Sequence, residues 1–333
     1  MQEGFFSLAS LVYRYTFIVM DSMNRRQYLA QKLQNIDLSS SFFSLESKQT
    51  YRTAITIAEK RIDFITTSSD LTERLRTYFS DYLDSSNLTC YSEIYIQPLP
   101  APESLLDLWE DEDAEFHITG SMAIHRDFAG IEISESNVKT KKVFAYVSSV
   151  LDDAFHNLLR WHIPSLLIQD QSFLMHSAGL IREGLGYIFF GQSGAGKSTC
   201  SGIIQKSDSK VQLLGDDAVI IQMKEDGTAM IHSAPLGCGY SRVAPPRLSA
   251  PLAGMFSIRQ SSINSVDPLT PSEGLASLLA SAMVTTWDEF PLERIELAQK
   301  FSQTQPKIKA LQFTKEPKFL DLIFKTNETG INL

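Results

Sequence analysis

Cysteine is scarce in this chain, and the few cysteines lack the spacing that common uses require. Only Cys90, Cys200 and Cys238 occur among 333 residues, and no two of them form a CxxC pair. An odd, scattered set argues against a disulfide framework and against a zinc site, because both need grouped cysteines. The pattern suits a reducing compartment, and we expect a cytoplasmic protein whose cysteines are ordinary buried residues.

Basic residues and long hydrophobic runs are also in short supply. Lys and Arg number 30 against 39 Asp and Glu, which leaves a net charge of −9. Phosphate backbones and anionic lipid headgroups repel such a chain, so we expect neither a nucleic-acid nor a membrane partner. The apolar segment Gly4–Met20 contains Arg14 and is short for a membrane span, so we expect it to be buried or frayed. A start at Met20 or Met23 stays open, and residues 1–19 would then not be native.

The chain is long enough for two domains, and its pattern changes near residue 140. Residues 1–140 are expected to form a variable, smaller N-terminal α+β region. The predicted elements there are strands at Arg61–Thr67 and Tyr91–Gln97, a helix at Asp70–Leu83 capped by Ser69 or Asp70, a linker at Pro98–Asp113, and two or three short strands within Phe116–Ser134.

Residues 141–333 are expected to form the domain that carries the chemistry. An amphipathic helix is predicted at Val143–Trp161, where apolar residues recur mostly three or four apart. The apolar runs 173–181 and 187–191 flank the connection Arg182–Gly186 and predict a hairpin. Further strands are expected at 211–215, 218–223, 229–234, 252–259 and 308–314, with helices opening at Thr270 and spanning 292–304 and 317–324. The hairpin favours an α/β fold with a mixed, largely antiparallel sheet over an all-parallel one.

The most specific motif follows the second hairpin strand directly. The segment reads Gly191-Gln192-Ser193-Gly194-Ala195-Gly196-Lys197-Ser198, then Thr199, and matches G-x-x-x-x-G-K-[ST]. Glycines let the backbone turn its N–H groups toward phosphate oxygens, and Lys197 adds a positive charge for the outer phosphates. The hydroxyl of Ser198 is a suitable ligand for Mg²⁺. The sequence therefore predicts a P-loop that binds a nucleotide.

An acidic pair arrives one helix and one strand later, in Leu214-Gly215-Asp216-Asp217. An acid at the end of the neighbouring strand can lie beside the phosphate loop. One carboxylate can hold Mg²⁺, and the other can accept the proton of an attacking hydroxyl. A solvated Asp-Asp turn is the plain alternative, but the apolar residues on both sides favour the functional interpretation.

Two further side chains are candidates for the same site. In a simple antiparallel register with Ile181 opposite Tyr187, His176 would face Gln192 in the loop, although a hydrogen-bonded core histidine explains the residue equally well. Arg242 ends a glycine-rich loop and could stabilise the charge of a transferred phosphoryl group, although a surface arginine on a plain turn is the simpler explanation.

Together, these residues resemble the superfamily of HPr kinase/phosphorylase and phosphoenolpyruvate carboxykinase. The resemblance is carried by Met175-His176-Ser177-Ala178, by Phe189-Phe190 leading into the loop, and by Gly215-Asp216-Asp217. It is specific over Phe173–Asp217 and implies a carboxykinase-like fold for the C-terminal domain. It also implies that Lys197 and the loop amides bind ATP phosphates, that Ser198, Asp216 and Asp217 hold Mg²⁺, and that Asp216, Asp217 and His176 serve catalysis.

The resemblance implies a Mg²⁺-dependent, ATP-using kinase that phosphorylates a hydroxyl of a protein, a peptide or a small molecule. Thr199 stands where HPr kinases usually have Glu, and no second HPr kinase signature is present, which argues against HPr as the substrate. The chain is much shorter than a carboxykinase, which argues against decarboxylation. A switch or motor NTPase and a nucleotide sensor without catalysis are the alternatives. The sequence does not name the acceptor, separate ATP from GTP or pyrophosphate, divide the roles of Asp216 and Asp217, or decide whether a homo-oligomer forms.

Overall fold

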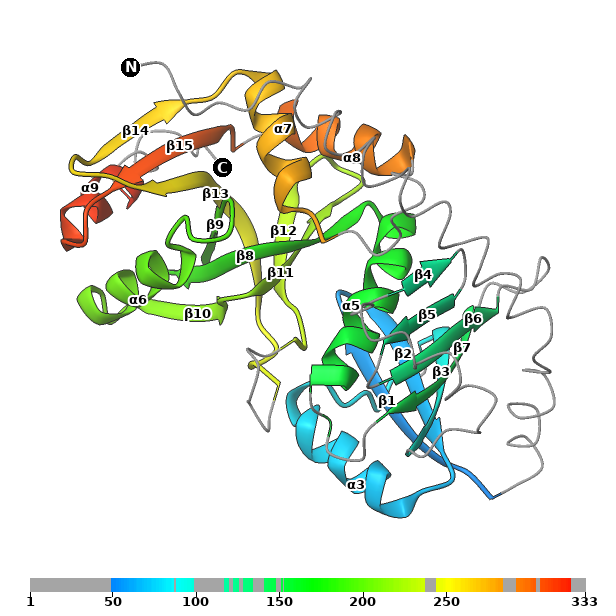
Figure 1. The fold of residues 1–333 in the computed structure, drawn as a ribbon. Coiled ribbons are helices and arrows are strands. Elements are labelled where there is room, and N and C mark those ends of the chain that lie inside the picture. The colour runs from blue at the N-terminus through cyan, green and yellow to red at the C-terminus, as the bar shows by residue number, and fades with distance from the viewer. Residues whose placement is uncertain are drawn as a thin grey trace.

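The computed structural model describes residues 49–86, 88–98, 117–119, 122–125, 128–133, 141–147, 151, 153–236, 244–283, 292–303 and 306–324. These residues form two mixed β-sheets with helices packed against them, so the chain has an α/β fold (Figure 1). No helix among the described residues has the length and apolar character needed to cross a bilayer.

Seven of the described strands form the first sheet, in the order β1-β2-β3-β7-β6-β5-β4. They are β1 (Tyr51–Ile57), β2 (Lys60–Thr66), β3 (Cys90–Pro98), β4 (His117–Thr119), β5 (Met122–His125), β6 (Phe128–Ile133) and β7 (Lys141–Val147). Helix α3 (Ser69–Tyr78) follows β2 and is capped by the side chain of Ser68, which accepts from the Leu71 amide. The short 3-10 helix η1 (Ser80–Tyr82) comes next. The sequence pattern predicted β2, β3 and the short strands β4 to β6, but it missed β1.

The predicted helix at Val143–Trp161 is wrong over its first part. Residues Lys141–Val147 form β7, which pairs in parallel with β3 and antiparallel with β6. Helix α5 begins only at Asp153 and ends at Leu167. Val143 and Ala145 are both buried in the sheet, two residues apart on one face. The apolar positions of this segment fit the period of a helix as well as that of a strand. The hydrogen bonds with β3 decide in favour of a strand.

The second sheet contains eight of the described strands and is mixed, as the hairpin predicted. They are β8 (Ser172–Arg182), β9 (Leu185–Phe190), β10 (Val211–Gly215), β11 (Ala218–Met223), β12 (Ala229–Ser233), β13 (Ser249–Gln260), β14 (Ser265–Pro268) and β15 (Ile308–Phe313). Only β9–β13 and β13–β15 are parallel pairs. Because β8 and β13 are linked both through β9 and through β11 and β12, the sheet closes on itself.

Helices cover the second sheet on two sides, with separate apolar clusters beneath them. Cys200 and Ile204 of α6 (Lys197–Ser207) pack with Phe189 and Leu180, whereas Leu278 belongs to a second cluster. The helices on that second cluster are α7 (Pro271–Ser281), which opens with the predicted Thr270–Glu273 capping box, and α8 (Leu292–Gln303). The chain's described part ends with η3 (Pro317–Phe319) and α9 (Leu320–Phe324), near the predicted last helix.

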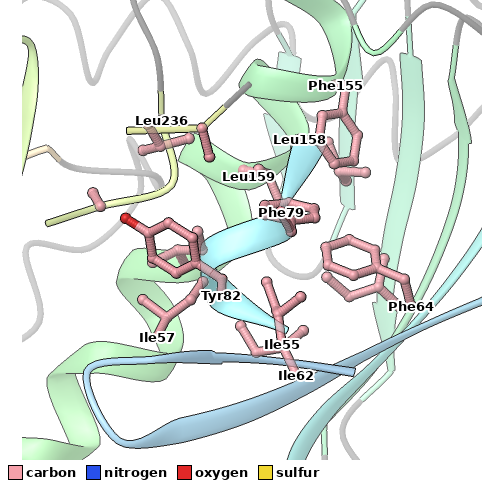
Figure 2. Close-up of a cluster of buried hydrophobic side chains, with 14 of the residues drawn as sticks. Ile55, Ile57, Ile62, Phe64, Phe79, Tyr82, Phe155, Leu158, Leu159 and Leu236 are labelled. Atoms are coloured by element: carbon pink, nitrogen blue, oxygen red, sulfur yellow. The ribbon is translucent and has the colours of Figure 1, made fainter. Parts of the chain in front are cut away.

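The two sheets share one hydrophobic core, which is centred on α5. Phe155, Leu158 and Leu159 of α5 are fully buried, together with Phe64 of β2 and Leu236, which follows β12 (Figure 2). Figure 1 shows α5 between the sheets. Burial of several large apolar side chains, each contributing about 1.5–3 kcal/mol, therefore ties the N-terminal sheet to the second one.

A partly buried chain of polar contacts crosses the same boundary. The ammonium of Lys60 on β2 lies 2.8 Å from Oδ1 of Asp170, which belongs to the 3-10 helix η2 (Ile168–Asp170). Gln222 of β11 donates to Oδ2 of Asp170 at 2.8 Å and accepts from Nε2 of His232 on β12 at 3.1 Å. Burial lowers the pKa of His232 to about 4. The positive charges of Lys224 and Arg247 act in the same direction, and Glu59 and Asp170 oppose them.

The pKa of His232 predicts how stability depends on pH. The folded protein keeps His232 neutral down to about pH 4, whereas an unfolded histidine takes up a proton near pH 6.5. Between these values the unfolded state binds more protons, so the free energy of unfolding decreases as the pH falls. We expect the wild type to lose up to about 3 kcal/mol more than His232→Gln between pH 7 and pH 4.5, measured by urea unfolding. Parallel pH profiles for the two proteins would contradict this.

Candidate phosphate-binding site

The glycine-rich segment 191–196 joins the end of β9 to the beginning of α6. Gly194 and Gly196 have φ angles of 80° and 97°, in the left-handed region that favours glycine. A Cβ added to Gly196 would lie 2.6 Å from Nε2 of Gln260 and 3.0 Å from Cζ of Phe313. The amide of Ala195 donates to the carbonyl of Gln192 at 3.0 Å and closes a tight turn. The backbone conformation of this loop therefore requires glycine, as the motif predicts.

Lys197 begins α6 and folds back over the loop. Its ammonium donates to the carbonyls of Gly191 at 3.1 Å and Gln192 at 3.4 Å, and the residue is only 7% exposed. Burial lowers the pKa of Lys197, and the negative charge of Asp217 opposes that shift. The charge of Asp217 therefore acts on Lys197, although the two residues belong to different parts of the sequence.

The remaining residues of the motif surround this lysine. Gln192, Ser193, Gly194 and Ser198 are exposed, and Ala195, Gly196 and Thr199 are half-buried. The first N–H groups of a helix have no acceptor within the helix, so the start of α6 presents donors and the positive end of its dipole to any ligand there. Phosphate binding by this segment stays a prediction.

Asp216 and Asp217 interrupt what is otherwise one continuous strand. Gly215 of β10 pairs with Gly179, and Ala218 of β11 pairs with His176, so both strands follow the same edge of β8. Their register is the same from Gly215 onward, after a shift between Leu213 and Gly215. The amide of Ser177 donates to the Asp217 carbonyl at 3.2 Å, between these two pairs. Neither acidic side chain is fully exposed. The pair therefore lies at the sheet surface and not on a protruding turn.

The carboxylate of Asp217 is held at both oxygens. Nδ1 of His176 lies 3.1 Å from Oδ1, and Nη2 of Arg160 donates to Oδ2 at 2.9 Å. The hydrogen bond from His176 and the charge of Arg160 lower the pKa of Asp217, although burial acts in the opposite direction. Asp217 therefore stays ionised at neutral pH and below.

The predicted register of the hairpin is wrong by one residue. Ser177 pairs with Phe190 and Arg182 with Leu185, so His176 does not face Gln192. The cause is the turn, which has two residues and not five, because Glu183 and Gly184 both adopt positive φ angles. His176 instead pairs with Ala218 in β11, and its imidazole contacts Asp217.

His176 lies at a point where two cores meet on one face of β8. Leu174 belongs to the core shared with α5, whereas Ala178 belongs to the cluster under α6. Residues two apart on a strand share a face, so His176 lies between them on that same face. Figure 1 shows α6 and α5 toward opposite ends of β8. The site is therefore built where the two helices leave part of the strand uncovered, and 41% of the His176 side chain is exposed there.

Arg160 is the one residue of this cluster that the sequence analysis did not find. It lies on α5 in the apolar run Leu158-Leu159-Arg160-Trp161, and its charge within that run was the available signal. Arg242 and the rest of the Gly237–Arg242 loop, Cys238 included, lie outside the described residues, so the role of Arg242 stays a prediction.

The comparisons with known proteins are of limited reach. A protein-family model described as "ScmC: SynChlorMet cassette protein ScmC" matches residues 160–315, a little less than half of the chain. No curated protein matches the chain significantly. A solved structure described as "Structure of the Hpr(Ser) kinase/phosphatase from Coxiella burnetii" is 11% identical, with 46% of this chain and 90% of that chain covered and a TM-score of 0.25. A similarity at that TM-score is distant and supports no inference about function.

Proposed function

We propose that the chain is a Mg²⁺-dependent, ATP-using phosphotransferase that transfers a phosphoryl group to a hydroxyl. The observation that carries the proposal is the coupling of two features. Phe190, which leads into the glycine-rich loop, pairs with Ser177, and the Ser177 amide donates to the carbonyl of Asp217 at 3.2 Å. The carboxylate of Asp217 is held by His176 and Arg160. A phosphate cradle and an ionised acid in one site are the parts that phosphoryl transfer requires.

The residues of the loop fit a triphosphate. Lys197 would exchange the two neutral carbonyls that it contacts now for charged phosphate oxygens, which form stronger hydrogen bonds. The N–H groups at the start of α6 would bind further oxygens. A side chain at Gly196 would crowd Gln260 and Phe313 and would strain a backbone with a φ angle of 97°, so the conformation of the loop favours glycine there.

The oxygen donors of the site suit Mg²⁺. Ser198 offers a hydroxyl and Asp216 and Asp217 offer carboxylates, and the residues that the structure describes contain no group of three His, Cys, Asp or Glu that could form a protein cage. Mg²⁺ typically takes one or two protein oxygens and completes its shell with water and phosphate. When bound, the ion would supply neutralisation of the charge on the transferred group.

We assign different roles to the two acids. The lowered pKa of Asp217 makes it a weak proton acceptor, so it suits a fixed negative charge or a metal ligand. Asp216 would then accept the proton of the attacking hydroxyl, and His176 would orient Asp217. Protein, peptide and small-molecule hydroxyls all stay candidates for the acceptor, and the cytoplasm stays the proposed location.

Substitution of the charged residues tests the proposed reaction. Lys197→Ala and Asp216→Asn should each reduce phosphotransfer by about a hundredfold or more, because one removes charge stabilisation and the other removes the proton acceptor. The assay follows transfer of label from γ-labelled ATP to components of a cell extract. Circular dichroism checks that the variants are folded.

Two exposed residues provide matched controls for this experiment. Lys206→Ala lies on the same helix, and Asp226→Asn lies on the turn between β11 and β12, so both should retain full transfer. Full transfer by Lys197→Ala and Asp216→Asn would rule out the proposed reaction. ATP hydrolysis without a labelled product would favour a switch NTPase instead.

The glycine loop allows a separate test of nucleotide binding. Gly196→Ala should raise the dissociation constant for a fluorescent ATP analogue at least about tenfold, because its Cβ would collide with Gln260 and its φ angle is strained. Gly202→Ala, in the middle of α6, meets nothing within 4 Å and should leave binding unchanged while stabilising the helix by up to about 1 kcal/mol. Equal affinities for the two variants would contradict a phosphate-binding role of the loop.

A further inference from the structure

Helix α5 contributes a charged side chain to a site that otherwise belongs to the second sheet. Arg160 donates from Nη2 to Oδ2 of Asp217 at 2.9 Å, and the two side chains are 31% and 24% exposed. A guanidinium is charged at every relevant pH and has a rigid planar geometry. This contact therefore constrains the direction of the Asp217 carboxylate as well as its charge.

The helix that carries Arg160 is firmly anchored to α3 and to the first sheet. His156 contacts the hydroxyl of Tyr78 at 2.7 Å, and His162 contacts the hydroxyl of Ser92 at 2.7 Å, both through Nε2. Leu159, next to Arg160, is fully buried in the shared core. These contacts join α5 to α3 and to the first sheet, so the guanidinium is presented from a fixed position.

Asp217 is fixed from several directions at once. His176 on β8 contacts Oδ1, Arg160 on α5 contacts Oδ2, and Ser177 donates its amide to the backbone carbonyl. The first and third contacts come from one strand. Among the contacts of the described residues, the one from Arg160 holds the carboxylate from a second element, and it sets the position of the carboxylate relative to α5.

We propose that Arg160 is a positioning residue, which fixes the orientation of Asp217 beside the phosphate loop and makes phosphoryl transfer depend on helix α5. The inference rests on the proposed function. The positioning role of Arg160 differs from a direct role in nucleotide binding, because Arg160 acts through Asp217. The positive charge at the loop comes from Lys197.

The test compares Arg160→Gln and Arg160→Lys with the wild-type full chain. Arg160→Gln should reduce kcat for transfer about 10- to 100-fold while KM for ATP changes less than about twofold, because a misplaced group affects the reacting geometry more than ground-state binding. Arg160→Lys should recover part of kcat, since it keeps the charge but loses the planar geometry. The Ser177 amide donates to the backbone carbonyl of Asp217, and this carbonyl would be held less firmly once the carboxylate loses Arg160. Hydrogen exchange of the Ser177 amide, measured without nucleotide, should therefore be about tenfold faster in Arg160→Gln than in the wild type.

Arg182→Gln is the matched control. Arg182 on β8 forms an ion pair with Asp208 at 2.7 Å, with exposed fractions of 25% and 17%, away from the loop. The control should leave kcat and exchange at Ser177 unchanged. The inference is overturned if Arg160→Gln retains kcat, if its loss appears in KM for ATP, or if Arg182→Gln loses as much kcat.

The exchange measurement separates this inference from the proposed function. If the wild type transfers no phosphate, the proposed function fails, and exchange at Ser177 alone then decides whether Arg160 holds Asp217. Unchanged exchange in Arg160→Gln would overturn that hold. Faster exchange, partly restored in Arg160→Lys, would support it.

Discussion

The burial of α5 between two sheets is the constraint on which the rest of this structure depends. Its apolar side chains complete the core of the first sheet, and the same cluster includes Leu174 of β8 and Ile220 of β11. Because these side chains can be removed from water only if both sheets contact the helix, the first sheet cannot be displaced without exposing the core of the second. The partly buried polar contacts from Lys60 to His232 depend on direction, which the apolar burial does not, and they fix how the two sheets face each other.

Strand β8 connects that packing to the candidate site, because its neighbours carry the site residues. One of its edges pairs successively with β10 and β11, the other pairs with β9, and its face carries His176 between the two cores. The antiparallel edge brings Asp217 to His176, and the hairpin leads into the glycine-rich loop. A carboxylate and an imidazole are thereby brought together by backbone pairing, and the guanidinium of Arg160 is added by helix packing.

Much of the second sheet could be predicted because its signals are local. Apolar runs and turn residues located most strands, and the Thr270 capping box located α7. Strands β1 and β14 were not predicted, and the other failures concerned the helix or strand period and the hairpin register. Residues 143–147 fit a helix as well as a strand until β3 supplies hydrogen bonds, and two positive φ angles at Glu183 and Gly184 shifted the hairpin by one residue. The contact of His176 with Asp217 was missed for a separate reason, because it forms at the other edge of β8, where β11 pairs with it.

By itself, the sequence determined the residue types of the candidate site and the elements that carry the loop, because glycine conformation and strand–helix patterns depend on near neighbours in the chain. Only the tertiary structure decided which charges meet. Arg160 and Asp217 are separated by 57 residues, and nothing in either local pattern encodes their contact. Their ion pair exists because the burial of α5 and the closure of the second sheet on β8 bring distant segments to one place, and long-range packing of that kind leaves no periodic trace in a single sequence.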